Sequence, residues 1–265
     1  VMSVMSTLLI ASVTVSAGTV VITEAVQIVD GGTSTDSQVG VASDSEGNVH
    51  VIWVRNNLHL YYSMLSPRGE TRIDATQISS AGLHKIWHPD MVIDTNDKVH
   101  IVWADRAGQH KIMYTVLNPW VAPLDGMASD DGTLSAIDDH VVSIRAQNRD
   151  WPAIDIDSQG GVHIVWEDSY DSLDKYFNQP QIYYTMLFLN MSNGLVITNF
   201  DDTLLTPIIG HKGHPDVVVD ANDYVQIAWD DTRGGKVELS FIVDTSGSMY
   251  SEWADICTVV YGGNF

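Results

Sequence analysis

The chain has 265 residues, with 34 acidic and 13 basic side chains and a formal net charge of −21. This excess of negative charge repels phosphate groups, which argues against nucleic acids and anionic membrane surfaces as partners. The single cysteine, Cys257, excludes an internal disulfide framework. With 8 Trp and 10 Tyr residues, the soluble part is expected to be ordered.

The segment 1–23 carries no charged residue, and the first charge is Glu24. A helix of this length would span roughly 35 Å, enough to cross a bilayer core. We therefore expect one long apolar helix, and the chain's start at Val1 suggests a processed N-terminus. Three interpretations remain open: an uncleaved secretory signal, a simple membrane anchor, and the assembly helix of a filament subunit. Interleaved small and hydroxylated residues favour the third, because they let apolar helices approach closely.

The run SVMSTLLIASVTVSAGTVV resembles the mature N-terminus of archaeal type IV pilins and archaellins. Bacterial type IV pilins usually carry Glu at position five, whereas Met5 stands here. The resemblance implies a subunit that passes through the membrane and then assembles with copies of itself into an extracellular, cell-surface filament. The core-forming positions would be Val4, Leu8, Leu9, Ile10, Val13, Val15, Val20 and Val21.

After Thr23 the pattern changes to short β-strands separated by Gly, Asn, Asp and Pro. A unit of the form Asp-x-x-x-x-Val-His-Ile-Val-Trp occurs four times, ending at Trp53, Trp103, Trp166 and Trp229. Each unit predicts a hairpin with a tight turn, followed by an aromatic third strand and a fourth strand. The spacing of 50, 63 and 63 residues between the tryptophans is typical of propeller blades.

The segment 25–29, AVQIV, lies 50 residues before the matching segment 75–79, ATQIS. We therefore expect it to be the outer strand of the last blade, which would close the ring and remove an open sheet edge. The predicted fold is mainly β, a four-bladed propeller closed by an N-terminal strand and preceded by one long helix. The corresponding domains are 1–23, 24–245 and a tail, 246–265; an open stack of hairpins is the alternative architecture.

The repeats resemble the degenerate sialidase-like repeats of microbial surface proteins. This resemblance implies a β-propeller without sialidase activity, since the chain shows no arginine triad among its 13 basic residues. The string Phe-Ile-Val-Asp-Thr-Ser-Gly-Ser-Met resembles the opening of a von Willebrand factor A domain. That resemblance implies Mg²⁺ ligands at Asp244, Ser246 and Ser248, although only 16 residues follow Met249, too few for that fold.

Acidic positions elsewhere are candidate cation sites. Asp130, Asp131, Asp138 and Asp139 lie in a long acidic insertion, which could bind Ca²⁺, Mg²⁺ or a partner, or remain a solvated loop. The aspartates that end the first strand of each unit could also bind Ca²⁺, but a turn-capping role is favoured; these are Asp44, Asp94, Asp157 and Asp220. Asn190-Met191-Ser192 is a glycosylation sequon, expected in a loop.

The repeated histidines and tryptophans are expected to be structural. His50, His100 and His163 share their position with Gln226, and a position that accepts either residue needs a hydrogen bond, not a metal. The four repeat tryptophans should fill the spaces between blades. No cofactor is certain, and no Ser-His-Asp ordering, phosphate loop or Cys/His cluster is present.

From these patterns the preferred hypothesis is a non-catalytic, pilin-like filament subunit that exposes its propeller for adhesion. The second hypothesis is a membrane-anchored surface module that binds a glycan or another cell-surface ligand. The third is a secreted hydrolase on a sialidase-like propeller. It requires a convergent charged site at the ring centre, for which the sequence motifs give no positive evidence.

Overall fold

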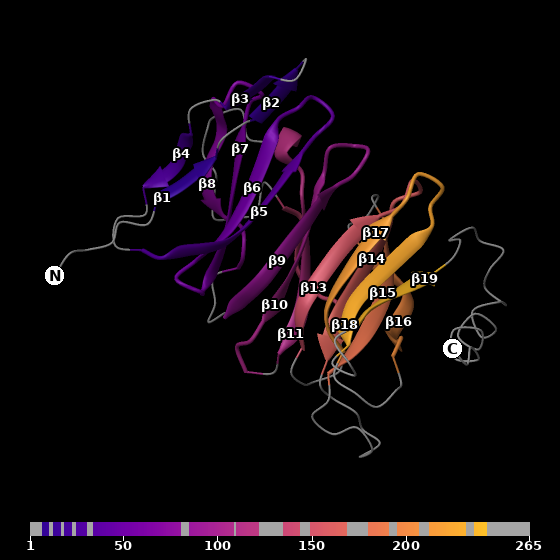
Figure 1. Ribbon diagram of the computed structural model, residues 1–265. Helices are drawn as coiled ribbons and strands as arrows, with labels where there is room; N and C mark the ends of the chain where they lie inside the picture. The colour runs from indigo at the N-terminus through magenta and orange to yellow at the C-terminus, as the bar shows by residue number, and fades with distance from the viewer. Residues whose placement is uncertain are drawn as a thin grey trace.

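The computed structural model is built almost entirely of β-strands (Figure 1). The structure describes residues 7–10, 13–16, 19–22, 25–30, 34–80, 85–108, 110–121, 135–143, 149–168, 180–190, 195–206, 212–231 and 236–242. The only helix among them is the three-residue 3₁₀ turn η1 (Pro119–Val121).

Four antiparallel sheets follow one another along the chain. The first contains β5 (Asp36–Ser43), β6 (Val49–Arg55), β7 (His59–Leu65) and β8 (Thr71–Gln77). The second contains β9 (Ile86–Ile93), β10 (Val99–Asp105), β11 (Lys111–Leu117) and β12 (Ser135–Val141). The third contains β13 (Arg149–Ile156), β14 (Gly161–Asp168), β15 (Gln181–Asn190) and β16 (Leu195–Leu204). The described part of the fourth contains β17 (Lys212–Val219), β18 (Val225–Asp231) and β19 (Lys236–Ile242).

An aspartate begins the tight turn between the first two strands of every sheet. In the second sheet, Asp94 Oδ1 accepts the backbone N–H groups of Asn96 and Lys98, each at 2.8 Å. The fourth residue of the turn is left-handed and is Gly47 (φ 80°), Asp97 (φ 59°), Gly160 (φ 85°) or Asp223 (φ 64°) in the successive sheets. The repeated aspartate therefore supplies the acceptor that fixes the turn, as the sequence predicts.

Hydrophobic clusters fill the spaces between successive sheets. Trp103 packs against the first sheet, Trp166 against the second and Trp229 against the third. The first three repeat tryptophans have no exposed surface and Trp229 is 7% exposed. One large flat residue per repeat thus holds each sheet on the sheet before it, which agrees with the sequence-based prediction.

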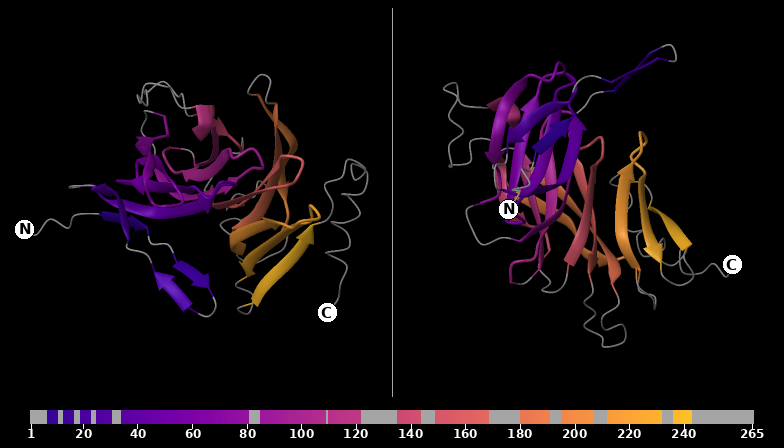
Figure 2. Two further views of the ribbon diagram at one scale, coloured as in Figure 1. Left: turned by 90° about the horizontal axis from the view of Figure 1, so that it is seen from above. Right: turned by 60° about the vertical axis from the view of Figure 1, so that its left-hand side comes forward.

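The first strands of the sheets form the inner side of an arc. Strand β5 lies beside β9, β9 beside β13, and β13 beside β17. Figure 2 shows the four sheets in chain order along this arc, with the first and fourth sheets at its two ends. The coarse prediction of a mainly β chain with four repeated sheets is therefore correct.

The predicted closure by the segment 25–29 is wrong. Strand β4 (Val26–Asp30) pairs with β1 (Thr7–Ile10) and lies beside β8, in the first sheet. Val26 and Ile28 pack on the cluster that contains Trp53. Among the described residues, β4 thus covers the outer face of the first sheet and does not extend the fourth.

The predicted N-terminal helix is also wrong. Its described residues form β1, which holds Leu8, Leu9 and Ile10, together with a hairpin of β2 (Val13–Ser16), which holds Val13 and Val15, and β3 (Thr19–Ile22), which holds Val20 and Val21. Val4 lies outside the described residues. Valine, isoleucine and threonine are stiff at χ1 and favour strands, and they dominate this segment. In the part of the chain that the structure describes, no helix has the length and apolar character needed to cross a bilayer.

Candidate functional site

A bulge occurs near the start of every inner strand. The pairing register shifts between Ser37 and Gly40 in β5, and at matching points in β9, β13 and β17. Each bulge holds one left-handed residue other than glycine: Gln38 (φ 54°), His88 (φ 49°), Trp151 (φ 47°) and His214 (φ 46°). Such conformations are unfavourable for these residue types, and they gather at binding and catalytic sites, where a bulge re-aims a side chain.

The bulges bring three aromatic rings together. The imidazole of His88 stacks on the indole of Trp151, with ring centroids 3.5 Å apart and planes inclined by 15°. The imidazole of His214 meets the same indole edge-on, at 4.4 Å and 81°. Trp151 remains 37% exposed. We call this group and the charged residues around it the axial cluster.

Charged side chains surround the three rings. His88 Nδ1 is 2.8 Å from Asp150 Oδ1, and Asp150 also forms an ion pair with Arg106. His214 Nδ1 is 2.7 Å from Asp230 Oδ2, and the His214 amide donates to Glu167 Oε2 at 3.3 Å. The imidazole of each bulge histidine is therefore held by one carboxylate.

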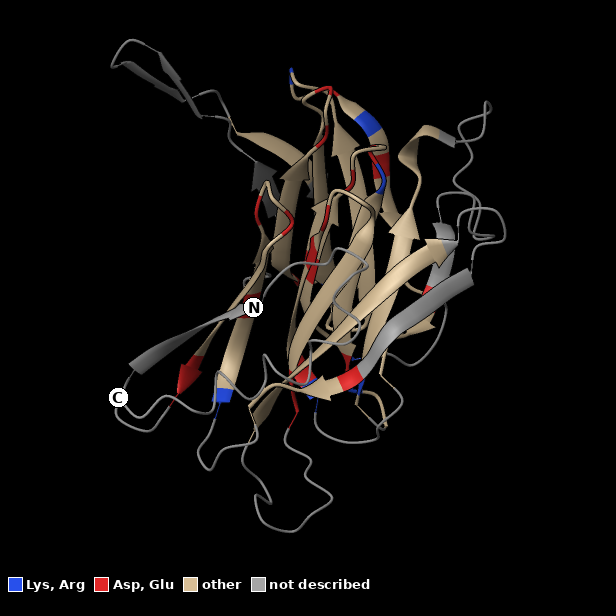
Figure 3. Cartoon of the chain, turned by 90° about the vertical axis from the view of Figure 1, so that its right-hand side faces the viewer, with Lys and Arg blue, Asp and Glu red and all other residues tan. Residues whose placement is uncertain are grey.

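Arg106 adds a cation–π contact to the cluster. Its guanidinium carbon lies 4.6 Å from the centroid of the Trp87 ring, a cation–π distance. Arg106 is the one basic side chain within this group, and Asp150 already neutralises it. The excess of carboxylates leaves the axial cluster acidic, and Figure 3 shows Asp and Glu at several points along the described strands.

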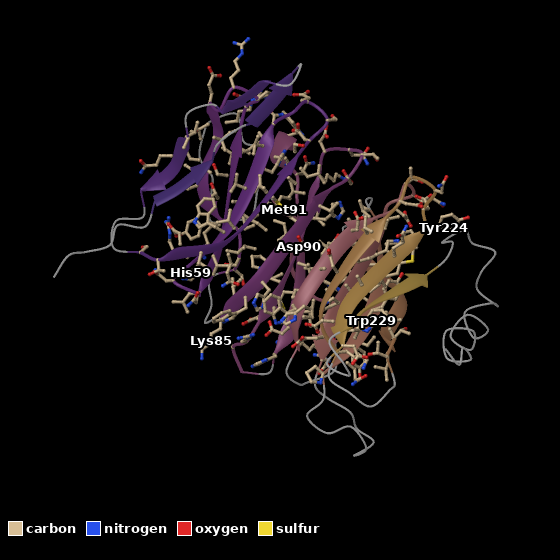
Figure 4. All side chains as sticks on the ribbon, viewed as in Figure 1. His59, Lys85, Asp90, Met91, Tyr224 and Trp229 are labelled. Carbon is tan, nitrogen blue, oxygen red and sulfur yellow. The ribbon has the colours of Figure 1, made fainter. Side chains whose placement is uncertain are left out.

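Three aspartates lie further along the inner strands: Asp90, Asp155 and Asp216. Asp90 Oδ2 accepts the Ile154 amide of the next sheet at 3.1 Å, and Asp155 Oδ2 accepts the Val219 amide at 2.6 Å. Inner strands are sheet edges with unpaired N–H groups, so these carboxylates satisfy donors that would otherwise lack a partner. Figure 4 labels Asp90 midway along β9, above Lys85 at the lower end of the sheet.

Burial shifts the pKa values of Asp90 and His88. Burial, together with the charges of Asp216 and Asp155, raises the pKa of Asp90 above its ordinary value, against hydrogen bonds from the Ile154 and Met91 amides. Burial and the nearby charge of Arg106 lower the pKa of His88 to about 4. At neutral pH the His88 imidazole is therefore uncharged, and the Asp90 carboxyl group has a raised pKa.

The turns at the opposite end of the sheets contain a second set of histidines. Nδ1 of each histidine forms a hydrogen bond with a tyrosine hydroxyl at 2.8–2.9 Å; the pairs are His50–Tyr62, His100–Tyr114 and His163–Tyr184. Their Nε2 atoms lie 3.2, 3.4 and 3.2 Å from Asp44, Asp94 and Asp157. Nδ1 of each histidine thus has the hydrogen bond that the sequence predicts, and in His50 and His163 the Nε2 atom is bonded as well.

Some of the other sites predicted from the sequence lie outside the described residues. These are Asp130, Asp131, Asp244, Ser246 and Ser248. Asp138 is part of β12, and Asp139 Oδ2 accepts the Ser80 amide at 2.8 Å. Asn190 ends strand β15, where it pairs with Leu195, whereas a loop was expected. The described part of the chain holds no group of three His, Cys, Asp or Glu side chains that could bind a metal ion.

Sequence reasoning missed the axial cluster, although a signal was present. His88-Pro89-Asp90 and His214-Pro215-Asp216 share a motif, and Trp151-Pro152 stands 63 residues from each histidine. This is the spacing of the repeat tryptophans. A repeated X-Pro step in phase with the repeat predicts a fixed backbone feature, since proline restricts itself and the residue before it.

No family model and no curated protein matches the sequence. Solved structures share its fold. The α-L-arabinanase of Penicillium chrysogenum matches with a TM-score of 0.51 and 9% identity over 89% of this chain and 67% of that chain. A protein of unknown function from Dyadobacter fermentans matches with a TM-score of 0.51 and 9% identity, covering 79% and 66%. The endo-arabinase of Bacteroides thetaiotaomicron matches at 0.46 and 15%, covering 78% and 75%.

These findings correct the sequence-based hypothesis. The resemblance to pilins and the prediction of a filament subunit are wrong, because the described N-terminal residues form strands and the shared fold includes that of an arabinanase. The prediction of a protein without enzymatic activity is contradicted by the same likeness. At this identity the likeness shows the fold alone: the chain has a β-sheet architecture that is also found in a solved α-L-arabinanase.

Proposed function

We propose that this protein is a carbohydrate-active enzyme that binds a polysaccharide at the axial cluster and cleaves its glycosidic bonds. The observation that carries the proposal is Trp151, a partly exposed indole fixed between two imidazoles and surrounded by carboxylates. The C–H groups of a sugar face are weakly positive and pack on the negative face of an aromatic ring. Carboxylates and imidazoles beside such a ring hydrogen-bond to the sugar hydroxyls.

Cleavage of a glycosidic bond requires one protonated and one ionised carboxyl group on opposite sides of the bond. Asp90 is the proposed acid, because burial raises its pKa and favours the protonated form. Asp216 is the proposed base, because it occupies the matching position on β17, is exposed, and contributes to the raised pKa of Asp90. A carboxyl group with a raised pKa, close to a second carboxyl group, is an arrangement that acid–base catalysis uses.

We also propose how the four sheets are arranged as a propeller. The four sheets are consecutive blades of a propeller-type arc, and the axial cluster lies where their inner strands begin. Its partner is a glycan, and an extracellular location suits a polymer that cannot enter a cell. Bound Ca²⁺ or Mg²⁺ at the acidic segment 125–139 stays a prediction.

The test is an activity assay on a panel of neutral and acidic polysaccharides, with release of reducing ends as the measurement. The native chain should release oligosaccharides, and Trp151→Ala and Asp216→Asn should each lower the rate at least about 100-fold. Trp120→Ala is the control, because this tryptophan is 42% exposed in η1, outside the axial cluster. Ultraviolet absorbance from a newly formed unsaturated sugar end would identify elimination in place of hydrolysis. Absence of activity on every polymer, or equal rates in all variants, would overturn the proposal.

A further inference from the structure

The outward face of the fourth sheet is the most unusual surface of the described chain. We infer that it binds a linear, uncharged polysaccharide chain that continues from the axial cluster along β17 and β18; this inference rests on the proposed function. The face consists of His214, Asp216, Val218, Tyr224, Gln226, Ala228 and Asp230.

The equivalent face of the first three sheets is buried against the next sheet. The positions that match Ala228 are Ile52, Val102 and Val165, which are fully buried. The position that matches Gln226 holds the buried histidines of the Tyr–His–Asp triads. In the fourth sheet these positions carry a small residue and an amide, so the residues that pack one sheet on the next have been replaced.

The fourth-sheet face is open to solvent at its centre. Val218 is 54% exposed and Tyr224 is 45% exposed, and Asp216 is also exposed. Exposed apolar side chains next to hydrogen-bonding groups are typical of binding surfaces. Polar groups that would be costly to bury against another sheet are suited to a hydroxyl-rich ligand.

Aromatic rings stand at both ends of this face. His214 contacts Trp151 at one end, and Tyr224 lies at the other, beside the turn that connects β17 and β18. Figure 4 shows Tyr224 and Trp229 towards opposite ends of β18. From His214 to the turn, six residues at about 3.3 Å each span roughly 20 Å, the length of roughly four sugar units.

The charges of the face select the class of polymer. Asp216 and Asp230 contribute carboxylates, and the seven residues that define the face include no lysine or arginine. A uronate polymer would be repelled at every sugar unit, whereas the hydroxyls of an uncharged polymer can donate to the carboxylates and to Gln226. Continuity with Trp151 and this charge pattern both point to a neutral chain at least four units long.

The experiment measures kcat/KM for neutral oligosaccharides of two to eight units, taken from whichever polysaccharide the activity panel identifies. In the native chain, kcat/KM should rise with length up to about four to six units. Tyr224→Ala should lower kcat/KM about 10-fold for hexamers and leave that for dimers unchanged, with Trp120→Ala as the matched control. Both variants alter exposed residues, and equal melting temperatures would confirm that they fold.

The outcomes separate the two proposals. If Tyr224→Ala has no length-dependent effect while Trp151→Ala abolishes activity, the extended surface is overturned and the proposed function stands. If neither change alters cleavage, or no polymer of either kind is cleaved, the proposed function itself is overturned. Preference for polygalacturonate over neutral chains would overturn the assignment of an uncharged substrate.

Discussion

His88 and Trp151 form a parallel ring stack across two sheets, with centroids 3.5 Å apart. The two residues occupy the same left-handed position in the bulges of β9 and β13. The stack therefore forms only when the inner strands of the second and third sheets are in register. It links the repeat architecture directly to the proposed site.

Acidification should disturb this stack. Burial and Arg106 lower the pKa of His88 to about 4, so its imidazole is neutral on the indole above that pH and charged below it. A protonated imidazole quenches indole fluorescence, so the emission of Trp151 should fall with a midpoint near pH 4. The difference between the spectra of the native chain and Trp151→Phe isolates this emission from the other seven tryptophans. His88→Gln should remove the transition.

The same shift predicts a trend in stability. The folded-state pKa of His88 lies below the ordinary value of 6.5, so the unfolded chain binds the proton first. The free energy of unfolding should therefore fall as the pH decreases from about 6.5 to about 4. Chemical denaturation at several pH values measures this slope, and a slope unchanged in His88→Gln would contradict the assignment.

The turns of adjacent sheets are joined by a serine–aspartate pair. The Ser45 amide and hydroxyl donate to the two carboxylate oxygens of Asp97 at 2.8 and 2.7 Å. Because the pair is exposed, a double-mutant cycle of Ser45→Ala and Asp97→Ala should give a coupling energy of only about 1 kcal/mol. Additive effects of the two changes would show that the pair contributes nothing.

The junction between the second and third sheets offers an engineering test. Ser158 and Asp223 repeat the pair between the third and fourth sheets, at 2.8 and 2.6 Å. At the middle junction the matching residues are Thr95 and Gly160, and Gly160 has the left-handed φ of 85°. Gly160→Asp should supply the missing carboxylate and change the free energy of unfolding by roughly +0.5 kcal/mol, whereas Gly160→Ala should only destabilise.

Removing a hydroxyl group from a buried Tyr–His–Asp triad should lower the stability of the fold. Tyr114→Phe removes the hydroxyl that lies 2.8 Å from His100 Nδ1 and should cost about 1–2 kcal/mol, because a buried nitrogen loses its partner. Tyr224→Phe is the matched control, since this residue is 45% exposed, and should change the stability by less than about 0.5 kcal/mol. Equal effects of the two changes in denaturant titrations would contradict a structural role for the triad.

Asp94 in this triad titrates at low pH. Burial alone would raise the pKa of Asp94, but hydrogen bonds from His100 and the Lys98 amide lower it to about 2. The stabilisation is complete above about pH 4 and is lost as the pH falls towards 2, about 1 kcal/mol after allowance for partial exposure. Asp94→Asn should flatten this part of the stability profile.

A buried ion pair fixes the start of the third sheet. Arg149 Nε lies 3.1 Å from Asp168 Oδ2, and both side chains are nearly inaccessible. Arg149→Ala should cost about 3 kcal/mol, because it removes the positive charge that lies beside the buried carboxylates of Asp168 and Asp202. Arg68→Ala, at an exposed turn, should change stability by less than about 0.5 kcal/mol. Similar melting temperatures for the two variants would contradict this prediction.

The sequence predicts the hairpins of all four sheets correctly because their signals are local. Asp44 and its counterparts cap turns through their own neighbours, and the apolar run that ends at each repeat tryptophan identifies a strand in the core. The helix prediction failed because the length and apolarity of segment 1–23 were weighted above its β-branched content. The closure prediction failed because matching strand sequences, such as 25–29 and 75–79, specify a strand but not its neighbour.

The axial cluster was harder to predict because it depends on long-range register. Nothing local in the sequence distinguishes Asp150, which binds His88, from the many other aspartates of this acidic chain. Trp151 has no aromatic neighbour in its own strand; His88 and His214 are supplied by the sheets on either side. Only the phase of the X-Pro steps with the repeat could have indicated the meeting point.

The serine–aspartate pairs occur at alternate junctions, since the left-handed turn residue alternates between glycine and aspartate. The turns at the middle junction, between the second and third sheets, lack such a pair. Their backbone amides should therefore exchange with solvent deuterium sooner than those of the paired turns. The ring stack of His88 and Trp151 holds the same junction at the opposite end of the sheets, so opening there should stay confined to the turns.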